Sequence, residues 1–380
     1  MPKIKLLNIC LISGFLFLGG CFTQTAFAQN ASKPNTKKQE TPKRVRYNAL
    51  TIDNEGKFWQ NNVPFTGGFY DVLKPDPQNP NKPPVTTVEG FCEDGLLSGE
   101  YRQYRANGKF SLRETYVKGT KEGPFYYYYE SGELEVKGEF QDGELSGTVQ
   151  GYYKSGKIYY INNYKAGKRN GNCDAFFENG TKETESHYSM GIPVGAHYGF
   201  FPDGEVRYFK VFNDSGILNG PNYVFHRTGC AALEEYYKNG KLDSVQKAWD
   251  VLSCTIIKSG EWKNGLKNGT FVDYNMFGDT LKMQSFLSGD PDGLYIEYKE
   301  KDGSEKEKAH FAIETIGQFD SGYAHGYWKY GQVTSFQKRE GAFDHGIKIG
   351  HWQYFDSEGD LLLEQWYSDK GELLEGKIYE

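Results

Sequence analysis

Histidine and cysteine are the first residue types to consider in this chain for metal or nucleophilic chemistry. The seven histidines are scattered along the 380 residues. The sequence contains no H-E-x-x-H or G-x-S-x-G motif, no phosphate-cradling glycine loop and no paired C-x-x-C. We therefore expect a protein that is not an enzyme and that binds no cofactor.

Three histidines near the C-terminus come closest to a metal-site pattern. His345 and His351 flank glycines, and they could approach His325. We find no carboxylate or cysteine beside them at ligand spacing, so polar residues next to turns are the favoured interpretation, and no metal ligand is assigned. The segment Asp290-Pro291-Asp292-Gly293 resembles the start of a calcium loop. It lacks the later ligands, which favours an ordinary turn.

These side chains lie on a repeat that is clearest between Gly95 and Gly204. Its unit is G-x3-G-x8-G-x10, which is 24 residues long and recurs five times without slippage. A fixed period of this length is typical of a repeat array. The repeated glycines are Gly95, Gly99, Gly108, Gly119, Gly123, Gly132, Gly143, Gly147, Gly156, Gly167, Gly171, Gly180, Gly191, Gly195 and Gly204.

Each unit has the pattern of a β-hairpin. In the unit from Gly119, an aromatic run is followed by Glu-Ser-Gly-Glu, and then by apolar residues at alternate positions. Dipeptides such as Asn107-Gly108 and Asn239-Gly240 favour turns, because Asn and Gly tolerate a positive φ. One unit cannot bury its apolar face, but stacked units can cover one another. We predict an all-β fold, an elongated antiparallel β-meander of about twelve hairpins, with strands about 4.8 Å apart.

Residues 1–28 have the composition of an export signal. Lys3 and Lys5 precede an apolar run from Leu6 to Gly20 that contains a single interruption, Asn8. The run is short for a helix that spans a bilayer. We expect an exported protein of the periplasm, the outer membrane or the cell surface.

Two cleavage sites remain open within this segment. Leu18-Gly19-Gly20-Cys21 resembles a lipobox, which would leave Cys21 as the lipidated first residue. Ala26-Phe27-Ala28 is an A-x-A site, which would release a soluble protein. A lipid on Cys21 is the one contact with a membrane that we expect.

The next segments divide the chain by composition. Residues 29–46 are polar and basic and predict a flexible tether. Residues 47–94 predict an N-terminal cap and a first repeat, enlarged by a proline-rich insertion at 74–84, and residues 95–380 predict the hairpin array. Residues 1–46 carry a net charge of +7, because Lys and Arg outnumber Asp and Glu there by seven. The whole chain has a net charge of −6, so residues 47–380 carry −13. This negative charge on the repeats argues against nucleic acid as a partner.

The repeat units resemble the MORN-variant repeats of the bacterial YwqK-type antitoxin family. The resemblance rests on Pro64-Phe65-Thr66-Gly67 and on glycine–aromatic units such as Gly350 to Gly359, and it covers nearly everything after residue 50. It implies a repeat scaffold with a role in protein binding. In that family, the antitoxin neutralises a cognate toxin in the cytoplasm, whereas this chain carries an export signal.

Two cysteines are placed by the repeat at equivalent positions. Cys230 and Cys254 are 24 residues apart, and an exported protein can form disulfides. In a hairpin meander, equivalent positions lie two strands or roughly 10 Å apart, beyond the Cα limit of about 7 Å for a bridge. A coiled solenoid would bring them within reach. We favour the meander, and we predict free thiols at Cys92, Cys173, Cys230 and Cys254.

Aromatic residues mark two further positions, counted from the second glycine of each unit. Position +5 is aromatic in nearly every unit, as expected of a structural ladder. Position +6 is aromatic in four consecutive units, and we name these residues the aromatic stripe. We hypothesise that the stripe binds a protein or a glycan, and the alternative is that it packs as core. The stripe consists of Tyr129, Tyr153, Phe177 and Phe201.

Taken together, these features favour a non-catalytic exported scaffold that binds a protein partner at the cell envelope. Two alternatives remain open. One is a carbohydrate-binding envelope module, because aromatic faces beside glycine turns can stack on sugars. The other is an immunity protein for an exported toxin.

Overall fold

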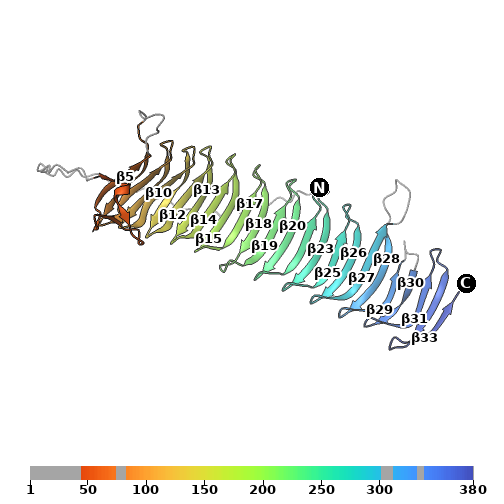
Figure 1. The fold of residues 1–380 in the computed structure, drawn as a ribbon. Helices are drawn as coiled ribbons and strands as arrows, with labels where there is room; N and C mark the ends of the chain where they lie inside the picture. Colours follow the sequence, from red (N-terminus) through yellow and green to blue (C-terminus); the bar gives the residue numbers. More distant parts are fainter. Residues whose placement is uncertain (1–43, 74–82, 301–310, 332–337, 380) are drawn as a thin grey trace, which may run out of the picture. The chain divides into compact units, whose positions relative to one another are not determined.

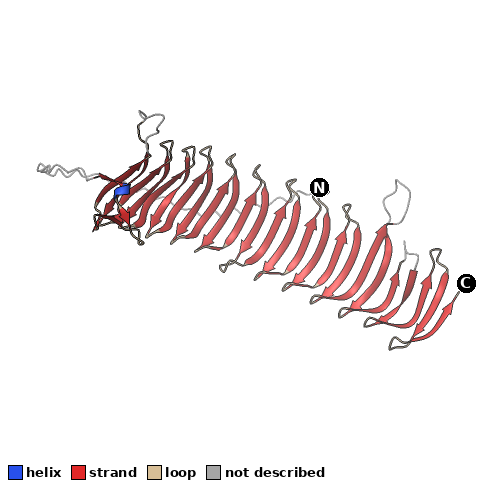
Figure 2. Ribbon diagram, in the orientation of Figure 1, coloured by secondary structure: helices blue, strands red, loops and turns tan. Residues whose placement is uncertain are grey.

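The structure, a computed structural model, describes residues 44–73, 83–300, 311–331 and 338–379. These residues belong to one compact unit, Lys43–Glu380. Thirty strands form a single sheet, in which successive strands pair antiparallel, and the sheet does not close (Figure 1). Figure 2 shows hairpins side by side, with a short helix near the N-terminal end of the described residues. The predicted β-hairpin meander is confirmed.

The elements follow one another along the chain with few interruptions. The strands of the large sheet up to residue 200 are β1 (Arg44–Arg46), β5 (Gly67–Val72), β6 (Thr86–Glu93), β7 (Leu96–Leu97), β8 (Gly99–Tyr104), β9 (Phe110–Val117), β10 (Thr120–Tyr128), β11 (Leu134–Gln141), β12 (Glu144–Tyr152), β13 (Ile158–Lys165), β14 (Lys168–Phe176), β15 (Lys182–Ser189), β16 (Ile192–Pro193) and β17 (Gly195–Phe200). The later strands are β18 (Val206–Phe212), β19 (Leu218–Phe225), β20 (Ala231–Lys238), β21 (Lys241–Leu242), β22 (Ser244–Trp249), β23 (Ile256–Lys263), β24 (Leu266–Lys267), β25 (Gly269–Tyr274), β26 (Thr280–Leu287), β27 (Asp290–Glu300), β28 (Phe311–Asp320), β29 (Tyr323–Tyr330), β30 (Lys338–Asp344), β31 (Ile347–Phe355), β32 (Leu361–Tyr367) and β33 (Leu373–Ile378).

The N-terminal end of the sheet is capped. The 3-10 helix η1 (Tyr47–Ala49) leads into a small sheet of β2 (Thr51–Ile52), β3 (Phe58–Gln60) and β4 (Val63–Pro64). Apolar residues of this segment, among them Leu50, Phe58 and Phe65, form a buried cluster with Phe69, Val88 and Cys92 of the first hairpin. The segment that the sequence suggested as a cap therefore contributes the core at this end.

Some of the predicted segments lie outside the described residues. These are the export signal with Cys21, residues 29–43 of the tether, and residues 74–82 of the proline-rich insertion. The last residues of the predicted flexible tether are instead part of the sheet. Arg44–Arg46 form strand β1, which pairs parallel with β5, and Arg44 bonds Glu89 at 2.8 Å. A partner strand and an acidic side chain order this basic segment.

The first glycine of each unit closes a tight turn at one edge of the sheet. Among the described residues, ten hairpins of the large sheet use a two-residue turn in which both residues have positive φ, as type I′ turns require. We call these the narrow turns. They are Asp94-Gly95, Lys118-Gly119, Asp142-Gly143, Ala166-Gly167, Met190-Gly191, Asn239-Gly240, Asn264-Gly265, Ser288-Gly289, Ser321-Gly322 and His345-Gly346.

Successive narrow turns are joined by a backbone hydrogen bond. From Gly119 on, the N–H of each narrow-turn glycine donates to the carbonyl two residues beyond the first glycine of the preceding unit, for example Gly143 to Lys121 at 3.0 Å. Gly216 is an exception among the first glycines, because it lies in the five-residue turn 213–217 and its N–H donates to Asn213 O at 3.0 Å. In units with a narrow turn, these bonds are 2.7–3.0 Å long. The strand bends before it continues, because the second glycine sits in a bulge; in Gly123, φ is 93°. The G-x3-G spacing thus encodes a turn followed by a bend.

The opposite edge carries longer turns, which we call the wide turns. In most of them, five residues are closed by hydrogen bonds such as Tyr129 N to Glu133 O, at 2.9 Å. The wide turns used below are 105–109, 129–133, 153–157, 177–181, 201–205, 226–230, 250–255, 275–279 and 356–360.

Many of the best-buried side chains form one row along the sheet. Each member of this row is the second residue after the second glycine of its unit, as in Phe125, Trp328 and Trp352. The cross-strand neighbour is often a glycine, and the ring lies over it; a Cβ at Gly138 would stand 2.8 Å from Phe125. The sequence analysis assigned the structural ladder to position +5, where the side chains are only half-buried.

Because the indole of Trp352 lies over Gly341, we expect Gly341→Ala to lower the free energy of unfolding by about 1–3 kcal/mol, as overpacking does. Gly376→Ala is the matched control. Its Cβ would have a nearest neighbour at 3.9 Å, so this change should be close to neutral. Urea unfolding of both variants measures the difference, and equal effects would contradict the close packing.

Candidate functional site

The aromatic stripe lies on the wide turns, and its tyrosines join one unit to the next. Each stripe residue is half-buried and is the first residue of its turn. The hydroxyl of Tyr129 donates to Tyr152 O at 2.6 Å, and that of Tyr153 donates to Phe176 O at 2.7 Å. Partial burial raises the pKa of Tyr153, so its hydroxyl keeps its proton at neutral pH. The two tyrosines therefore have a structural role, which is the alternative to binding that the sequence analysis left open.

Other residues at position +6 make the same contact. Arg105 Nη2 donates to Tyr128 O at 2.9 Å, and His226 Nε2 lies 3.3 Å from Trp249 O. The shared property is a hydrogen-bond donor and not an aromatic ring. Phe177 and Phe201 have no side-chain hydrogen-bond donor, so these two half-exposed residues of the stripe do not join neighbouring turns in this way.

The clearest exposed apolar group on the wide-turn edge was missed by the sequence analysis. Val251 and Leu252 lie in one wide turn, and Met276 and Phe277 lie in the next. Leu252 is 83% exposed and Phe277 is 78% exposed. At the corresponding tips, other wide turns carry residues such as Glu130-Ser131 and Glu178-Asn179. We call Val251, Leu252, Met276 and Phe277 the apolar tips.

Hydrogen bonds hold the backbone of both tips in place. Asp250 Oδ1 accepts from the N–H groups of Leu252 and Ser253 at 3.0 and 2.8 Å, and these bonds lower the pKa of Asp250. Asn275 Oδ1 accepts from the N–H of Phe277 at 2.9 Å. The hydroxyl of Thr255 donates to Met276 O at 2.8 Å and joins the two turns. The exposed side chains therefore stand on an ordered base.

A disulfide lies beside the apolar tips. Cys230 and Cys254 are bonded, with their Cα atoms 5.7 Å apart, so the prediction of free thiols is wrong for this pair. The prediction failed because the estimate of 10 Å describes the spacing of strands, whereas both cysteines lie in wide turns, and neighbouring wide turns contact each other. In addition, the turn at 250–255 is one residue longer than the turn at 226–230. The meander is retained. The prediction is confirmed for Cys92 and Cys173, which are free and buried.

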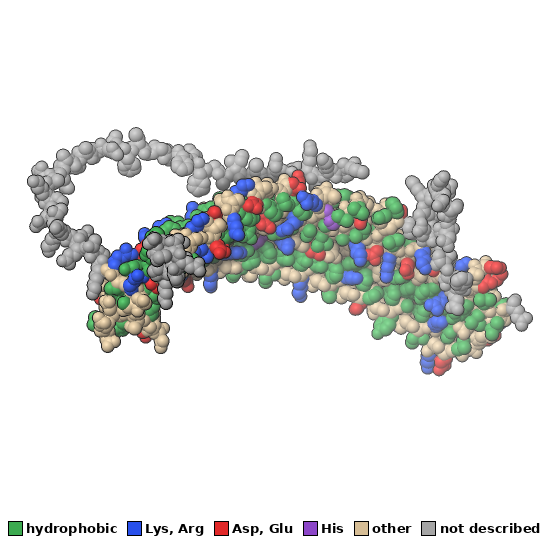
Figure 3. Space-filling view, turned by 45° about the horizontal axis from the view of Figure 1, so that its top comes forward, with side chains coloured by type: hydrophobic (Ala, Val, Ile, Leu, Met, Phe, Trp, Pro, Cys, Tyr) green, Lys and Arg blue, Asp and Glu red, His purple; other side chains and the backbone are tan. Residues whose placement is uncertain are grey.

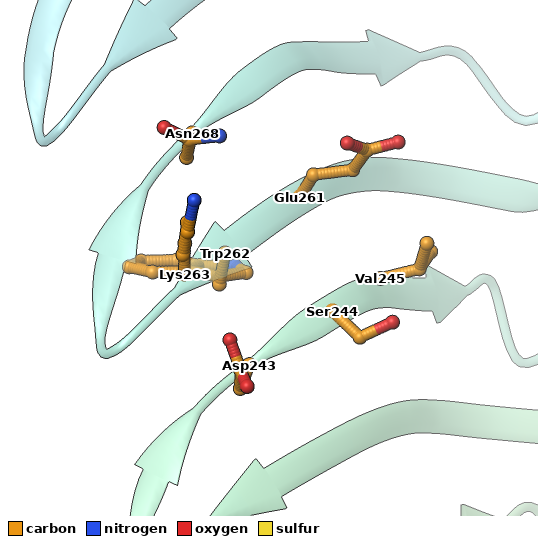
Figure 4. A pocket seen from close by; sticks show the side chains of 7 residues that line it. All are labelled: Asp243, Ser244, Val245, Glu261, Trp262, Lys263 and Asn268. Atoms are coloured by element: carbon orange, nitrogen blue, oxygen red, sulfur yellow. The ribbon is translucent and has the colours of Figure 1, made fainter.

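The shallow hollow shown in Figure 4 lies between the strands around β22 and β23. It has a volume of about 400 Å³ and is lined mainly by polar and charged side chains, with Val245 and Trp262 as the apolar ones. Ser244 occupies the place of a second glycine and has a φ of 111°. The residues that line the hollow are Asp243, Ser244, Val245, Glu261, Trp262, Lys263 and Asn268. These residues do not form a nucleophile–base pair or a metal-ligand set.

Two of the three histidines considered above lie together. His325, Asp344 and His345 place one ligand atom each within 4.8 Å of the others. The sequence analysis overlooked Asp344, although it adjoins His345. His351 lies elsewhere, stacked on Trp366 and 2.8 Å from Glu364. The segment Asp290-Pro291-Asp292-Gly293, which we interpreted as an ordinary turn, instead begins strand β27, directly after a narrow turn. There, Asp292 accepts a hydrogen bond from Ser321 N at 3.4 Å.

With the geometry described, the chain can be compared with known proteins. Residues 121–142 and 145–166 match the family described as MORN repeat variant, and they coincide with two successive hairpins, β10–β11 and β12–β13. No curated protein matches the chain. The described residues include no helix that could cross a membrane.

Three solved structures show a distant likeness. "Crystal Structure of TcdB2-TccC3" is 12% identical with a TM-score of 0.12, over 87% of this chain and 21% of that chain. "Crystal Structure of TcdB2-TccC3-Cdc42" is 10% identical with a TM-score of 0.10, over 87% and 27%. "Crystal Structure of TcdB2-TccC3 without hypervariable C-terminal region" is 10% identical with a TM-score of 0.09, over 87% and 26%. The chain spans about a quarter of their length, and these scores are too low to bear on fold or function.

The disulfide leads to a direct chemical test. Among the four cysteines beyond residue 46, we expect iodoacetamide to label Cys92 and Cys173 alone after unfolding without reductant. Both should resist labelling in the folded protein, since burial raises the pKa of Cys92 to about 12 and also raises that of Cys173.

Peptide mapping without reductant should recover a linked pair that contains Cys230 and Cys254. Reduction should lower the free energy of unfolding by about 3 kcal/mol, because the bridge closes a loop of 24 residues. Labelling of all four cysteines before reduction would contradict the bridge.

Proposed function

We propose that the chain is a non-catalytic exported scaffold that binds a protein partner at the cell envelope through its wide-turn edge. The observation that supports this most is the pair of neighbouring turns that carry the apolar tips. Exposed apolar side chains in adjacent, hydrogen-bonded turns are the kind of group that anchors protein interfaces. The half-exposed rings of Phe177 and Phe201 extend the same edge.

The rest of the molecule favours a surface function over a catalytic one. The hollow near Trp262 is shallow, and its residues lack convergent catalytic groups. Figure 3 shows hydrophobic side chains along the visible face, interspersed with basic and acidic ones. Mixed charge of this kind suits a protein partner better than a polyanion.

The proposed location rests on the N-terminal sequence. The apolar run with its lipobox-like end at Cys21 supports export, with or without a lipid anchor. The Cys230–Cys254 disulfide is consistent with an oxidising compartment. The resemblance to antitoxins supports protein binding as the activity, and in an exported chain the bound protein would lie outside the cytoplasm.

The apolar tips can be tested by substitution. We expect Leu252→Ser with Phe277→Ser to reduce capture of the main partner from envelope fractions at least tenfold, because truncated anchors cost roughly 2 kcal/mol or more. The readout is quantitative mass spectrometry of proteins that co-purify with the chain, with circular dichroism as the check of folding.

The matched control is Val117→Ser with Leu287→Ser, which alters two half-exposed apolar residues at the ends of β9 and β26, beside narrow turns. Its captured proteins should equal those of the unaltered chain. The proposal fails if the tip variant and the control capture the same proteins in the same amounts, or if polysaccharide is bound and protein is not.

A further inference from the structure

We propose that His325, Asp344 and His345 form a binding site for a divalent transition-metal ion such as Zn²⁺. The site lies on the narrow-turn edge and is separate from the surface proposed above. His325 belongs to β29, Asp344 ends β30, and His345 is the first residue of the following narrow turn. Two imidazoles and one carboxylate are a ligand set that zinc, nickel and copper accept.

The side chains already face one another. Asp344 Oδ1 lies 2.6 Å from His345 Nδ1 and 3.4 Å from His325 Nδ1. The two imidazole rings are 5.4 Å apart between centroids, and their planes are inclined at 67° to each other. Ligand atoms bound to one zinc ion are about 3.3 Å apart, from bond lengths near 2.0 Å, so small side-chain rotations would complete the set.

The backbone fixes the distance between the two histidines. The N–H of Gly346 donates to Ala324 O at 2.8 Å, and these residues adjoin His345 and His325. His345 holds a φ of 45° in its narrow turn, which sets the direction of its side chain. The ligands therefore come from two successive units that a hydrogen bond already joins.

The same position has a different role in other units. In five of the described units, the side chain of the third residue after the first glycine accepts a hydrogen bond from the N–H of the residue that precedes the next first glycine. Glu122 accepts from Asp142 N at 2.8 Å, and Asn170 accepts from Met190 N at 3.1 Å. Further examples are Asn219 with Asn239 at 3.0 Å, Asp243 with Asn264 at 3.3 Å and Asp292 with Ser321 at 3.4 Å.

At His325, this turn-to-turn contact is replaced. Its Nδ1 is shielded from solvent and has no hydrogen-bond partner, although it faces a carboxylate and a second imidazole. An unpaired nitrogen at this depth is costly unless something binds it. A metal ion would accept the lone pair of Nδ1 in the neutral tautomer and would be held by Asp344 and His345 at the same time.

Zinc titration of the tag-free full chain, freed of metal with chelator, tests the site. Calorimetry should show one ion bound per chain, and the ion should raise the unfolding temperature, because it binds the folded state alone. His325→Asn, Asp344→Asn and His345→Asn should each weaken zinc binding by about tenfold or more, in line with the effect of losing groups that support a metal.

Two of these changes are chosen to preserve the fold. His325→Asn restores the residue found at this position in the units of Asn170 and Asn219, and His345→Asn matches the narrow turns that begin with Asn239 and Asn264. Without zinc, His325→Asn should be at least as stable as the unaltered chain. His351→Ala is the control, because His351 contacts Glu364 instead, and it should bind zinc unchanged.

The inference is overturned if the unaltered chain binds no stoichiometric zinc, or if His325→Asn and His345→Asn bind it as tightly as the unaltered chain. Loss of binding in His351→Ala equal to that in His325→Asn would also overturn it.

Discussion

One backbone hydrogen bond, repeated from unit to unit, explains most of this architecture. It joins the N–H of a first glycine to the carbonyl two residues beyond the preceding first glycine. The bond requires a two-residue turn with positive φ, which favours glycine, and a bend a few residues later, which again favours glycine. In an isolated hairpin the glycine N–H of such a turn points to water, whereas here it bonds the neighbouring unit.

Most of the variation in the repeat lies away from these bonds. The connections after β5, β27 and β29 are longer than the other wide turns, and those strands end at the wide-turn edge, where no backbone bond of this kind is required. On the narrow-turn edge, the turn 213–217 is an exception, and its Gly216 N–H donates to Asn213 O instead of to the preceding unit. The wide turns are joined by side chains, such as Tyr153 to Phe176 O. Because side-chain contacts tolerate substitution, this edge can carry the apolar tips without disturbing the sheet. The narrow-turn edge thus keeps the hairpins in register, and the wide-turn edge carries the variable residues that we propose for binding.

Burial in a single sheet depends on the row of residues that follows the second glycine. At both ends, aromatic rings such as Phe125 and Trp352 cover neighbouring strands, whereas polar residues occupy the middle. There, Glu235 lies on the strand beside the row, opposite Asn222, where it is buried and accepts hydrogen bonds from Asn222, Tyr237 and Gln246 at 2.7–2.9 Å. Near the N-terminal end, burial raises the pKa of Glu114, but Lys121 and two tyrosine hydroxyls outweigh this effect and lower it. The row is thus held by packing in some units and by charge-assisted hydrogen bonds in others.

The sequence was sufficient to predict the fold, because the period of 24 and the turn glycines are local signals. It was insufficient for contacts between turns. The Cys230–Cys254 bridge, the hydroxyl of Tyr129 on Tyr152 O and the approach of His325 to Asp344 all depend on how adjacent turns lean together. Strand spacing alone does not give that geometry. The apolar tips did have a signal, since Leu252 and Phe277 stand in turns that are otherwise polar, but only the structure shows that the two turns are neighbours.

Hydrogen exchange at the narrow-turn glycines tests the central claim most directly. If each first glycine donates to the preceding unit, the amides of Gly119, Gly143, Gly167 and Gly191 should exchange as slowly as amides within the adjoining strands. Exchange of these four amides at the rate of an unstructured peptide, while the strands stay protected, would contradict it, because the hairpins would then be joined by their strands alone.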